Sequence, residues 1–517
     1  MWPASVSALS RDQLIHASFP HEAQTLELRE THLSYVLLTG QFAYKVKKAL
    51  KLDFVDASTL ERRRRLCEEE LRLNRRYAPD LYLSVVPITA DRGTLRFGGE
   101  GPPIEYAVQM RQFDPKLELP ALLRDNAVDI VQLTDLADRI AAFHAAALPL
   151  RDAGDRGTRW FLDKAQENLA SLLARAKHLG EEVRMAKIEA WTRRTLSEKA
   201  EQLRERERRG SIRECHGDLH CGNVVRWEGR LIPFDCIEFD PELRFIDVLN
   251  DVAFLVMDLM TRGRADLAFG FLSRYLERTG DYSGVPLLPT YLVYRALVRA
   301  KVELTAFEQH PEASDILERA HAYIDTAASI IQPTNPATLV IMHGASGSGK
   351  SWLSAQLVPA LRALRVRSDL ERKRLAGIDP FDPDARPSQD IYTLDFNERT
   401  YDYMRECARA CLQSGISTIV DAAFLRTHER RAFAELAREH GASFLIVSCQ
   451  AEEATLVSRI AARRAARNDP SDADEAVMRQ QLRTMEPFVE DELPHVLQVG
   501  THAPDALRTV RSRVLEP

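Results

Sequence analysis

The chain has 517 residues, of which 45% are hydrophobic and 28% are charged, and its formal net charge is −6. A chain of this length exceeds what a single hydrophobic core usually serves, so we expect more than one domain. The composition is that of an ordinary globular protein, and the acidic balance argues against a dedicated nucleic-acid-binding protein, which usually carries a basic footprint.

The cysteines and the amino-terminal segment indicate a compartment. The seven cysteines are an odd number without a C-x-x-C pair, so we expect free thiols in a reducing environment. Residues 1–10 lack the basic and apolar parts of a signal peptide. No apolar run approaches the ~18 residues that a membrane span needs. These features predict a cytoplasmic protein with no membrane partner.

The first part of the chain predicts a small mixed α/β lobe. β-branched and aromatic residues between turn signals indicate short strands, and a turn at 31–34 joins the first two. A strongly charged helix is expected over 58–77, with Ser58 as its N-cap. The expected strands span residues 25–29, 35–38, 42–47, 81–88 and 104–113.

Helical periodicity dominates from about residue 117 to 330. Short strands around 213–235 interrupt the helices. The charged run 201–209 predicts a solvated helix face rather than a nucleic-acid patch. His144 lies on a mostly apolar helix and is expected to be a core or interface residue. The expected helices span residues 133–147, 160–176, 181–209 and 291–331.

Residues 216–223 read His-Gly-Asp-Leu-His-Cys-Gly-Asn, and an apolar strand that ends at Asp235 follows them. A kinase catalytic loop needs a carboxylate that accepts the proton of the substrate hydroxyl, an Asn five residues later for a metal ion, and a second metal-binding Asp on a nearby strand. Asp218, Asn223 and Asp235 meet these requirements at suitable spacing. The pattern predicts a phosphotransferase site for ATP and Mg²⁺.

The motif His216-Gly-Asp-Leu-His220, together with Asn223 and Phe234-Asp235, resembles the aminoglycoside phosphotransferase (choline kinase-like) family over roughly residues 25–330. The resemblance implies a bilobal, protein-kinase-like fold. It also implies a lysine that contacts phosphate, a glutamate partner for that lysine on the following helix, and an adenine-binding hinge between the lobes.

Carried onto this sequence, the resemblance makes Lys45 the candidate phosphate lysine and Lys47, on the same strand face, the alternative. Glu69 and Glu70 are the candidate partners, and Glu70 is the one that we assign to the nucleotide site. Residues 109–113 are the expected hinge.

Two further features accompany this resemblance. The chain departs from a G-x-G-x-x-G loop, and Ser and Thr hydroxyls in the first hairpin turn stand in its place. Arg244, Asp247 and Asp251 resemble supporting residues of the family, with Asp247 or Asp251 expected to brace the catalytic loop.

The segment Gln332-Pro-Thr-Asn-Pro336 is the predicted domain boundary, because its prolines and short polar residues end the preceding helix. We expect a kinase-like domain over 1–332 and a second domain over 337–517. In the second domain, strands at 339–342, 363–367, 416–420 and 443–449 alternate with helices, which predicts a parallel α/β sheet of the P-loop NTPase class.

The sequence Gly344-Ala-Ser-Gly-Ser-Gly-Lys-Ser351 matches the phosphate-binding pattern G-x-x-x-x-G-K-[ST] in full, between a predicted strand and a predicted helix. Backbone N–H groups of this loop would cradle phosphates at the helix N-terminus. Lys350 would reach the β- and γ-phosphates, and Ser351 would bind Mg²⁺. The predicted nucleotide-binding residues of the loop are Gly344, Ser346, Gly347, Ser348, Gly349, Lys350 and Ser351.

Two aspartates complete the second predicted site. Asp421 ends a strand with the form of a Walker B strand and would lie beside Mg²⁺. Asp369 and Arg372 resemble the acceptor corner of P-loop kinases, which include gluconate kinases, adenylylsulfate kinases and zeta toxins. Asp369 would hold or deprotonate an acceptor hydroxyl, and Arg372 would bind an anionic substrate. A helix N-cap and a surface charge are the alternative roles of this pair.

Four arginines, Arg459, Arg463, Arg464 and Arg467, lie along one predicted basic helix. They resemble a lid that closes over the transferred phosphoryl group, and arginines supplied in this way contribute roughly 10³–10⁵ in rate. A basic solvated helix face is the alternative.

The order of the two parts resembles a bacterial family of fused ATP-binding proteins. It predicts an ATP-dependent phosphotransferase with two nucleotide sites, which transfers the γ-phosphoryl group to a hydroxyl of a small molecule. One alternative is a catalytic kinase domain with a regulatory nucleotide-binding module. Another is a kinase that acts on a macromolecule, where the acidic balance argues against nucleic acid.

Overall fold

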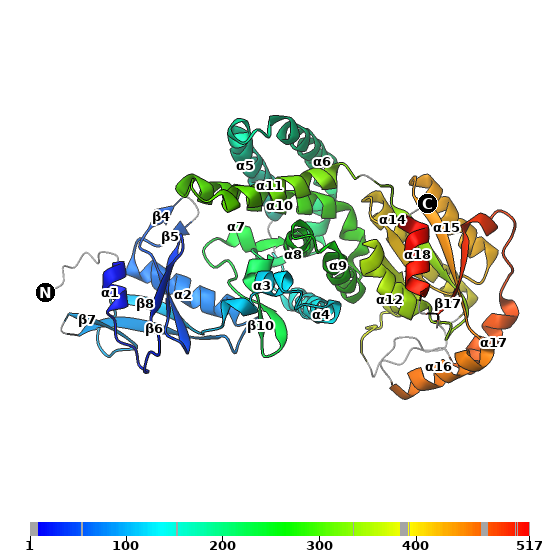
Figure 1. Cartoon of the computed structure of the whole chain (residues 1–517), viewed down its shortest axis with the longest axis horizontal. Helices are drawn as coiled ribbons and strands as arrows, with labels where there is room; N and C mark the ends of the chain where they lie inside the picture. Colours follow the sequence, from blue (N-terminus) through cyan, green and yellow to red (C-terminus); the bar gives the residue numbers. More distant parts are fainter. Residues whose placement is uncertain are drawn as a thin grey trace. The chain divides into compact units, whose positions relative to one another are not determined.

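The computed structural model describes residues 9–52, 55–91, 93–150, 154–333, 335–382, 391, 393–466, 474–501, 503 and 505–515. The chain forms two compact units, Met1–Phe161 with Arg204–Asp251, and Leu162–Leu203 with Val252–Pro517. Figure 1 labels the helices and strands of both. The second unit contains helices from before segment 332–336 and the sheet that follows it.

The first unit contains a six-stranded antiparallel sheet, drawn in blue in Figure 1, in the order β1-β2-β3-β8-β6-β7. The sequence predicts five of these strands and misses β7, because four residues after a tight turn give too short an alternation to detect. The strands are β1 (Glu27–Glu30), β2 (Ser34–Leu38), β3 (Phe42–Lys47), β6 (Tyr82–Asp91), β7 (Thr94–Phe97) and β8 (Glu105–Arg111).

Helices cover both faces of this sheet. On one face, α2 (Leu60–Asn74) packs its buried Leu73 into a core with Val108 of β8. On the other, α1 (Arg11–Ile15) places Leu14 against Tyr44 of β3. Successive side chains of a strand point to opposite faces. Lys45 and Lys47, which alternate with Tyr44, therefore lie on the α2 side.

The N-cap of α2 is Thr59, and the prediction of Ser58 is wrong by one residue. The Thr59 side chain accepts the N–H of Arg62 at 3.3 Å, as an N-cap residue does. The Ser58 hydroxyl instead donates to Asp56 Oδ1 at 2.6 Å. The Ser58 hydroxyl is therefore bonded to Asp56 rather than to a backbone N–H group of α2.

Short helices and hairpins complete the first unit. They are β4 (Lys51–Leu52), β5 (Val55–Asp56), η1 (Pro115–Leu117), α3 (Leu119–Arg124), α4 (Ile130–Ala146), β9 (Ile212–Glu214), η2 (Cys221–Asn223), β10 (Val224–Trp227), β11 (Arg230–Pro233), α7 (Pro241–Arg244) and β12 (Phe245–Asp247). Strands β10 and β11 pair with each other, as do β9 and β12.

Three helices contribute to both units by their residue ranges, namely α5 (Arg156–Leu179), α6 (Glu182–Arg208) and α8 (Val248–Thr261). The second unit adds α9 (Ala265–Thr279), η3 (Asp281–Leu287), α10 (Leu288–Gln309) and α11 (Ser314–Ile331). The helical pattern predicted over 291–331 is therefore two helices, which separate at the segment that contains Pro311.

The second unit also holds a five-stranded parallel sheet in the order β14-β15-β13-β16-β17. Four strands are predicted from the sequence, and β17 is missed. They are β13 (Thr338–His343), β14 (Leu364–Arg367), β15 (Thr418–Asp421), β16 (Ser443–Gln450) and β17 (Val496–Gly500). The flanking helices are α12 (Lys350–Leu361), α13 (Ser368–Leu375), α14 (Leu394–Gln413), α15 (Thr427–Glu439), α16 (Glu453–Ala466), α17 (Glu475–Thr484) and α18 (Ala506–Leu515).

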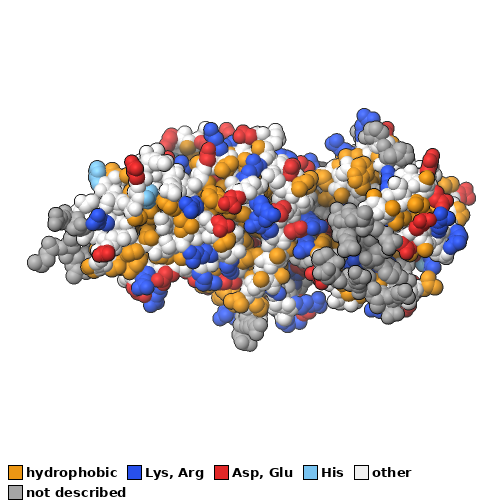
Figure 2. Space-filling model, turned by 90° about the horizontal axis from the view of Figure 1, so that it is seen from below, with side chains coloured by type: hydrophobic (Ala, Val, Ile, Leu, Met, Phe, Trp, Pro, Cys, Tyr) orange, Lys and Arg blue, Asp and Glu red, His pale blue; other side chains and the backbone are white. Residues whose placement is uncertain are grey.

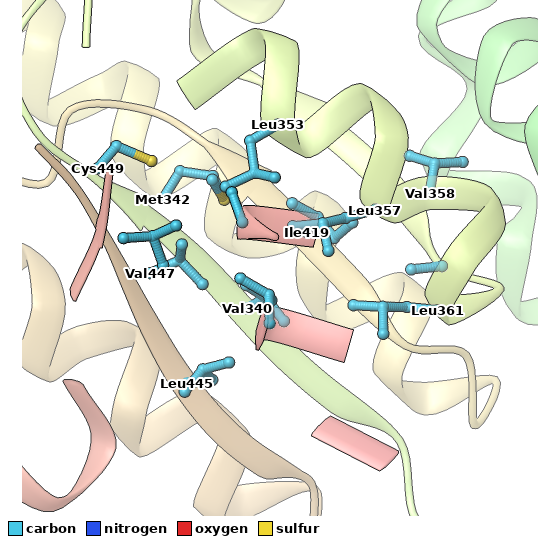
Figure 3. Packing of buried hydrophobic residues seen from close by; sticks show 14 residues of the cluster. Val340, Met342, Leu353, Leu357, Val358, Leu361, Ile419, Leu445, Val447 and Cys449 are labelled. Atoms are coloured by element: carbon cyan, nitrogen blue, oxygen red, sulfur yellow. The ribbon is translucent and has the colours of Figure 1, made fainter. Parts of the chain in front are cut away.

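The core of this sheet forms where α12 packs on the central strands. Figure 3 shows Val340 and Met342 of β13 and Val447 of β16 beside Leu353 and Leu357 of α12. Strand β13 is buried along its whole length, as expected of a parallel strand with both faces covered. This packing fixes the end of β13 against the start of α12.

The surface charges, the cysteines and the helices can be compared with the expectations from the composition. On the face drawn in Figure 2, basic and acidic side chains are interspersed, which is the mixed pattern of a solvated surface. All seven cysteines are buried free thiols. None of the helices in the described ranges combines the length and the apolar character that crossing a membrane requires.

Candidate active sites

In the first unit, Lys45 on β3, which is partly buried, forms an ion pair with the fully buried Glu70 on α2. Lys45 Nζ lies 2.9 Å from Glu70 Oε1 and also donates to Asp235 Oδ1, after β11. Burial alone would lower the pKa of Lys45, but Asp235 and Glu70 raise it well above its ordinary value. Three predicted site residues from three separate elements therefore meet through their side chains.

The alternative lysine, Lys47, contacts the same glutamate. Lys47 Nζ lies 2.5 Å from Glu70 Oε2 and also donates to Glu238. Burial alone would raise the pKa of Glu70, but the two lysines lower it to about 2. Sequence reasoning missed Glu238, and its place three residues after Asp235 was the available signal. Because Lys45 alone of the two lysines pairs with Asp235, the geometry favours Lys45 as the phosphate lysine.

Glu69, the other candidate partner, belongs to a separate cluster. Its carboxylate accepts hydrogen bonds from Arg72 at 2.7 Å and from Arg244 at 2.8 Å. Both arginines also bind Glu214 of β9. Glu69 and Arg244 therefore tie α2 to the strand that precedes the catalytic motif, while Glu70 serves the lysines.

The predicted catalytic loop lies between β9 and β10. Asn223 Nδ2 donates to the backbone oxygen and to Oδ2 of Asp218, each at 2.9 Å. His220 Nε2 is 3.4 Å from the same Oδ2 atom. The N–H of Phe234 donates to the carbonyl of Asn223 at 2.9 Å. This bond holds the loop next to Asp235, so the backbone joins the three predicted residues.

Asp251, in the first turn of α8, braces this loop. Its carboxylate accepts the N–H groups of His216 at 3.2 Å and Gly217 at 2.9 Å. The buried side chain of His144 places Nε2 3.0 Å from Asp251 Oδ2. His144 is thus a core residue, as the sequence predicts. Of the two bracing candidates, Asp251 contacts the loop, whereas Asp247 pairs with an arginine of α6.

A cavity of about 200 Å³ opens beside Lys45 and Asp235. The predicted hinge contributes part of its wall, and so does Thr31 of the first hairpin turn. Asp218 and Asn223 do not line it. Its apolar wall residues are Val36, Leu38, Ala43, Met110, Phe113, Pro115 and Phe234. A cavity that combines apolar walls with an ammonium group and a carboxylate suits a nucleotide base and its phosphates.

In the second unit, the phosphate loop joins β13 to α12. Gly344, Gly347 and Gly349 all have positive φ. At Gly349, φ is +90° and a Cβ atom would lie 2.6 Å from Thr501 Oγ1, so only glycine fits without a displacement. The Thr501 hydroxyl donates to the carbonyl of Ser348 at 2.7 Å. The segment after β17 thus fixes the loop.

Lys350 and the loop residue Ser346 line the same cavity. Lys350 Nζ donates to the carbonyl of Ala345 at 2.9 Å. Burial lowers the pKa of Lys350, and Asp421 opposes this shift. The N–H of Ser346 donates to Gln481 Oε1 of α17 at 2.7 Å. An N–H group that binds an oxygen of the cavity wall is also suited to a phosphate oxygen.

These groups line a cavity of about 380 Å³. The structure gathers predicted nucleotide, metal and acceptor residues on its wall. They are Ser346, Gly347, Gly349, Lys350, Ser351, Asp369, Arg372, Asp421, Arg459 and Arg463. Gly344 and Ser348 belong to the loop but not to the wall.

The predicted metal residues of this site supply oxygen donors. Asp421 ends β15 and is 4% exposed. Its Oδ2 accepts the hydroxyl of Ser354 at 3.1 Å and lies 3.7 Å from Arg367 Nε. Ser351 lines the same cavity. Carboxylate and hydroxyl oxygens are hard ligands of the kind that Mg²⁺ prefers, so the donor set fits the predicted metal.

The predicted acceptor corner also borders the cavity. Asp369 lies in the first turn of α13. The Arg372 guanidinium donates to the carbonyl of Ile391 at 2.9 Å and to Asn397 Oδ1 at 2.7 Å. Arg372 is therefore held against α14 while it lines the cavity.

Sequence reasoning missed Glu429 and Tyr401 on the same wall. Glu429 is 8% exposed, and burial raises its pKa. It is hydrogen-bonded to Tyr401 and accepts the N–H of Arg426 at 3.2 Å. The available signal was the placement of Glu429 in the first turn of the helix after Asp421, because helix starts after parallel strands border such sites.

The two predicted lid arginines whose side chains the structure describes both reach the cavity. Arg459 donates to the carbonyl of Gly347 at 3.3 Å and to Thr501 Oγ1 at 3.0 Å, and Arg463 lines the wall. The side chain of Arg464 and the whole of Arg467 lie outside the described residues.

The folds and sites define two kinase-like parts. The first is a protein-kinase-like fold with a lysine–glutamate pair, and the second is a P-loop kinase-like parallel sheet. A family model described as an AAA domain matches residues 339–488. The predicted resemblance to both classes and the predicted fold class are confirmed. The residue sets and the family match support ATP-dependent phosphotransferase chemistry.

A protein of Mycobacterium tuberculosis (strain ATCC 25618 / H37Rv), called "Uncharacterized protein Rv2004c", is 31% identical over 455 residues, which cover 86% of this chain and 87% of that protein. A protein of Mycobacterium bovis shows the same identity and coverage. The chain belongs to the family of these mycobacterial proteins.

Solved structures resemble either part. A choline/ethanolamine kinase family protein from Mesorhizobium loti has 11% sequence identity and a TM-score of 0.37, with coverage of 62% of this chain and 94% of that chain. A gluconokinase from Sinorhizobium meliloti 1021 has 21% identity and a TM-score of 0.26, with coverage of 35% of this chain and 94% of that chain.

Proposed function

We propose that this protein is an ATP-dependent phosphotransferase with two nucleotide sites, and that it transfers the γ-phosphoryl group to a hydroxyl of a small molecule. One observation carries the proposal. In each kinase-like part, a partly buried lysine and a carboxylate of metal-binding type border the same cavity, namely Lys45 with Asp235 and Lys350 with Asp421.

At the first site, Asp218 would accept the proton of the acceptor hydroxyl while the hydroxyl oxygen forms a bond to the γ-phosphorus. The bond from that phosphorus to the β,γ-bridging oxygen breaks, and ADP leaves. Lys45 would hold phosphate oxygens, and Asn223 and Asp235 would hold Mg²⁺. Bound Mg²⁺ supplies positive charge that neutralises the phosphate oxygens.

At the second site, the backbone N–H groups of the loop and Lys350 would hold the phosphates, and Ser351 and Asp421 would hold Mg²⁺. Asp369 would take the proton of a second acceptor hydroxyl. Arg459 and Arg463 would contact the phosphoryl group as it moves, because both arginines reach this wall. Positioning and fixed charge supply most of the catalysis in such reactions.

The test is a screen for ADP release against hydroxylated small molecules, such as sugars and aminocyclitols, with Mg²⁺ present. Asp218→Ala and Lys350→Ala should each abolish a different ADP-releasing activity. Unchanged turnover in one variant, with altered activation or affinity, would instead support a regulatory role for that site. If the whole panel failed to stimulate turnover while a protein substrate did, the small-molecule acceptor would be wrong.

A further inference from the structure

The edge strand β14 of the parallel sheet contacts α9 and η3, which lie outside the residues matched by the AAA domain model. In the second unit, α9 packs against β14 and α12. The backbone N–H of Arg365 donates to Ser273 Oγ of α9 at 3.0 Å. The carbonyl of Arg365 accepts the hydroxyl of Tyr282, in η3, at 2.7 Å. Both backbone groups of this strand residue are therefore bonded to side chains from before the phosphate loop.

The side chain of Arg365 continues this connection toward the phosphate site. Its Nε donates to Glu277 Oε1 of α9 at 2.7 Å, and Glu277 is only 2% exposed. Its Nη1 donates to the carbonyl of Ser351 and to Ser354 Oγ, each at 3.2 Å. The Ser354 hydroxyl then donates to Asp421 Oδ2 at 3.1 Å. Hydrogen bonds thus run without a break from α9 to the carboxylate expected beside Mg²⁺.

The charges along this path explain why Glu277 matters. A buried guanidinium needs a carboxylate partner, since an unpaired buried charge is costly. Arg365 has two carboxylates within its network, Glu277 directly and Asp421 through Ser354. A second arginine, Arg367, already lies 3.7 Å from Asp421. If Glu277 were neutral, Arg365 would turn to Asp421 for its counter-charge and would compete there with a metal ion.

Glu277 is well suited to hold Arg365. Burial alone would raise the pKa of Glu277, but Arg365 and Arg367 lower it, so Glu277 is ionised near neutral pH. The other Glu277 oxygen, Oε2, lies 3.6 Å from Arg274 Nη1. Glu277 therefore keeps its negative charge, and Arg274 holds its carboxylate close to α9.

We propose that Glu277 is a positioning residue of the second nucleotide site: by holding Arg365, it fixes the Ser351–Ser354 turn and leaves the Asp421 carboxylate available to Mg²⁺. The inference rests on the proposed nucleotide function of this site. It makes α9 a structural support of that site, although η3, α10, α11 and β13 lie between α9 and the phosphate loop in the sequence.

The test is calorimetric titration of the full chain with ATP, with and without Mg²⁺, in a Lys45→Ala background that disables the first site. Glu277→Gln should weaken binding of Mg²⁺–ATP about tenfold. It should change binding of metal-free ATP by less than about twofold, because the loop amides and Lys350 remain in place. Binding of Mg²⁺–ATP equal to that of the parent would overturn the proposal.

The double variant Glu277→Gln/Arg365→Gln separates competition for Asp421 from simple loss of structure. Removing the guanidinium removes the competitor, so Mg²⁺–ATP affinity should recover to within about threefold of the parent. Affinity as weak as in the single variant, or weaker, would overturn the proposal. Glu439→Gln is the matched control, since Glu439 pairs with Arg409 at 2.8 Å on the exposed surface of the same unit. It should bind like the parent.

A third variant serves if Glu277→Gln does not fold, as thermal unfolding will show. Ser354→Ala removes the hydroxyl that links Arg365 to Asp421 and that also lies 3.2 Å from the carbonyl oxygen of Ser351. It should weaken binding of Mg²⁺–ATP about threefold and leave metal-free binding unchanged. Unchanged Mg²⁺ dependence would overturn the proposal. If the parent itself bound no Mg²⁺–ATP, the proposed function of the second site would fail and this inference would fall with it.

Discussion

The two candidate sites fix a lysine in different ways. Lys45 is held by carboxylates that come from α2 and from the residue after β11, far apart in the sequence. Lys350 is held by a glycine-rich loop within six residues of itself, through the carbonyl of Ala345. The first site therefore depends on long-range side-chain pairs, and the second depends on local backbone geometry. Substitution of a distant carboxylate should therefore disable the first site, and substitution of a loop glycine should disable the second.

The largest effect is expected for Glu70→Gln. This change removes the carboxylate that Lys45 and Lys47 share, and breaking a buried ion pair costs about 3–5 kcal/mol. We expect unfolding of the first unit at a clearly lower temperature and loss of nucleotide binding there. Calorimetric titration with ATP in a Lys350→Ala background would measure the binding.

Glu69→Gln is the matched control for Glu70→Gln. Glu69 pairs with arginines at a partly exposed position, where an ion pair contributes less. Nucleotide binding should persist in this variant. If Glu69→Gln removed binding and Glu70→Gln did not, the assignment of the lysine partner would be reversed.

The second prediction tests whether the second site depends on the backbone geometry of its glycine-rich loop. Gly349→Ala combines positive φ with a Cβ atom 2.6 Å from Thr501 Oγ1, so the loop must move. We expect a loss of about 1–3 kcal/mol in stability and at least tenfold weaker nucleotide binding at the second site. Gly377→Ala also has positive φ, at +71°, but its Cβ would meet nothing within 4 Å. It should cost stability without a change in binding, as titration and thermal unfolding would show.

The third prediction uses pH to separate the two lysines. Burial lowers the pKa of Lys350 below its ordinary 10.5, whereas Asp235 and Glu70 raise the pKa of Lys45 well above the same value despite burial. As the pH rises toward 10.5, Lys350 loses its proton first. Nucleotide binding should therefore weaken at the second site before it weakens at the first. Titrations of the Lys45→Ala and Lys350→Ala variants at several pH values would compare the two sites, and the reverse order would contradict the prediction.

The smallest effect is expected for Gln481→Ala. Gln481 Oε1 accepts the N–H of Ser346 at 2.7 Å, where we expect a phosphate oxygen to bind. Removing the side chain frees that donor, so nucleotide affinity should be unchanged or about twofold higher. A tenfold loss of affinity would show that Gln481 itself contacts the nucleotide.

The comparison also explains how much the sequence could predict. The phosphate loop was predicted residue by residue, because its geometry depends on glycines and a helix start that are contiguous in the chain. Asp218, Asn223 and Asp235 could be predicted because they lie within 18 residues at the spacing of a kinase catalytic loop. Glu70 was assigned to the nucleotide site over Glu69, but spacing alone does not separate the two, since both lie on α2 and tertiary packing directs Glu70 to the lysines of β3.

Other features depend on long-range packing, so their local sequence signals were too weak to assign them. Glu238 and Glu429 reach their sites only after strands and helices assemble, and Glu277 acts through Arg365 from another part of the chain. Strand β17 was missed because its five residues give too short an alternation to detect. Its neighbour Thr501 nevertheless secures the phosphate loop. The sequence therefore predicted the chemistry of each site better than its supports.

The burial of every cysteine has a practical consequence. Burial raises the pKa of Cys67, Cys411 and Cys449 to about 12, and thiolate is the form that reacts with maleimides. The native chain should therefore label slowly. A cysteine introduced at Val477, which is 42% exposed on α17 and borders the second cavity, would be the fast-reacting thiol. A fluorophore there would report the arrival of ATP without any knowledge of the acceptor.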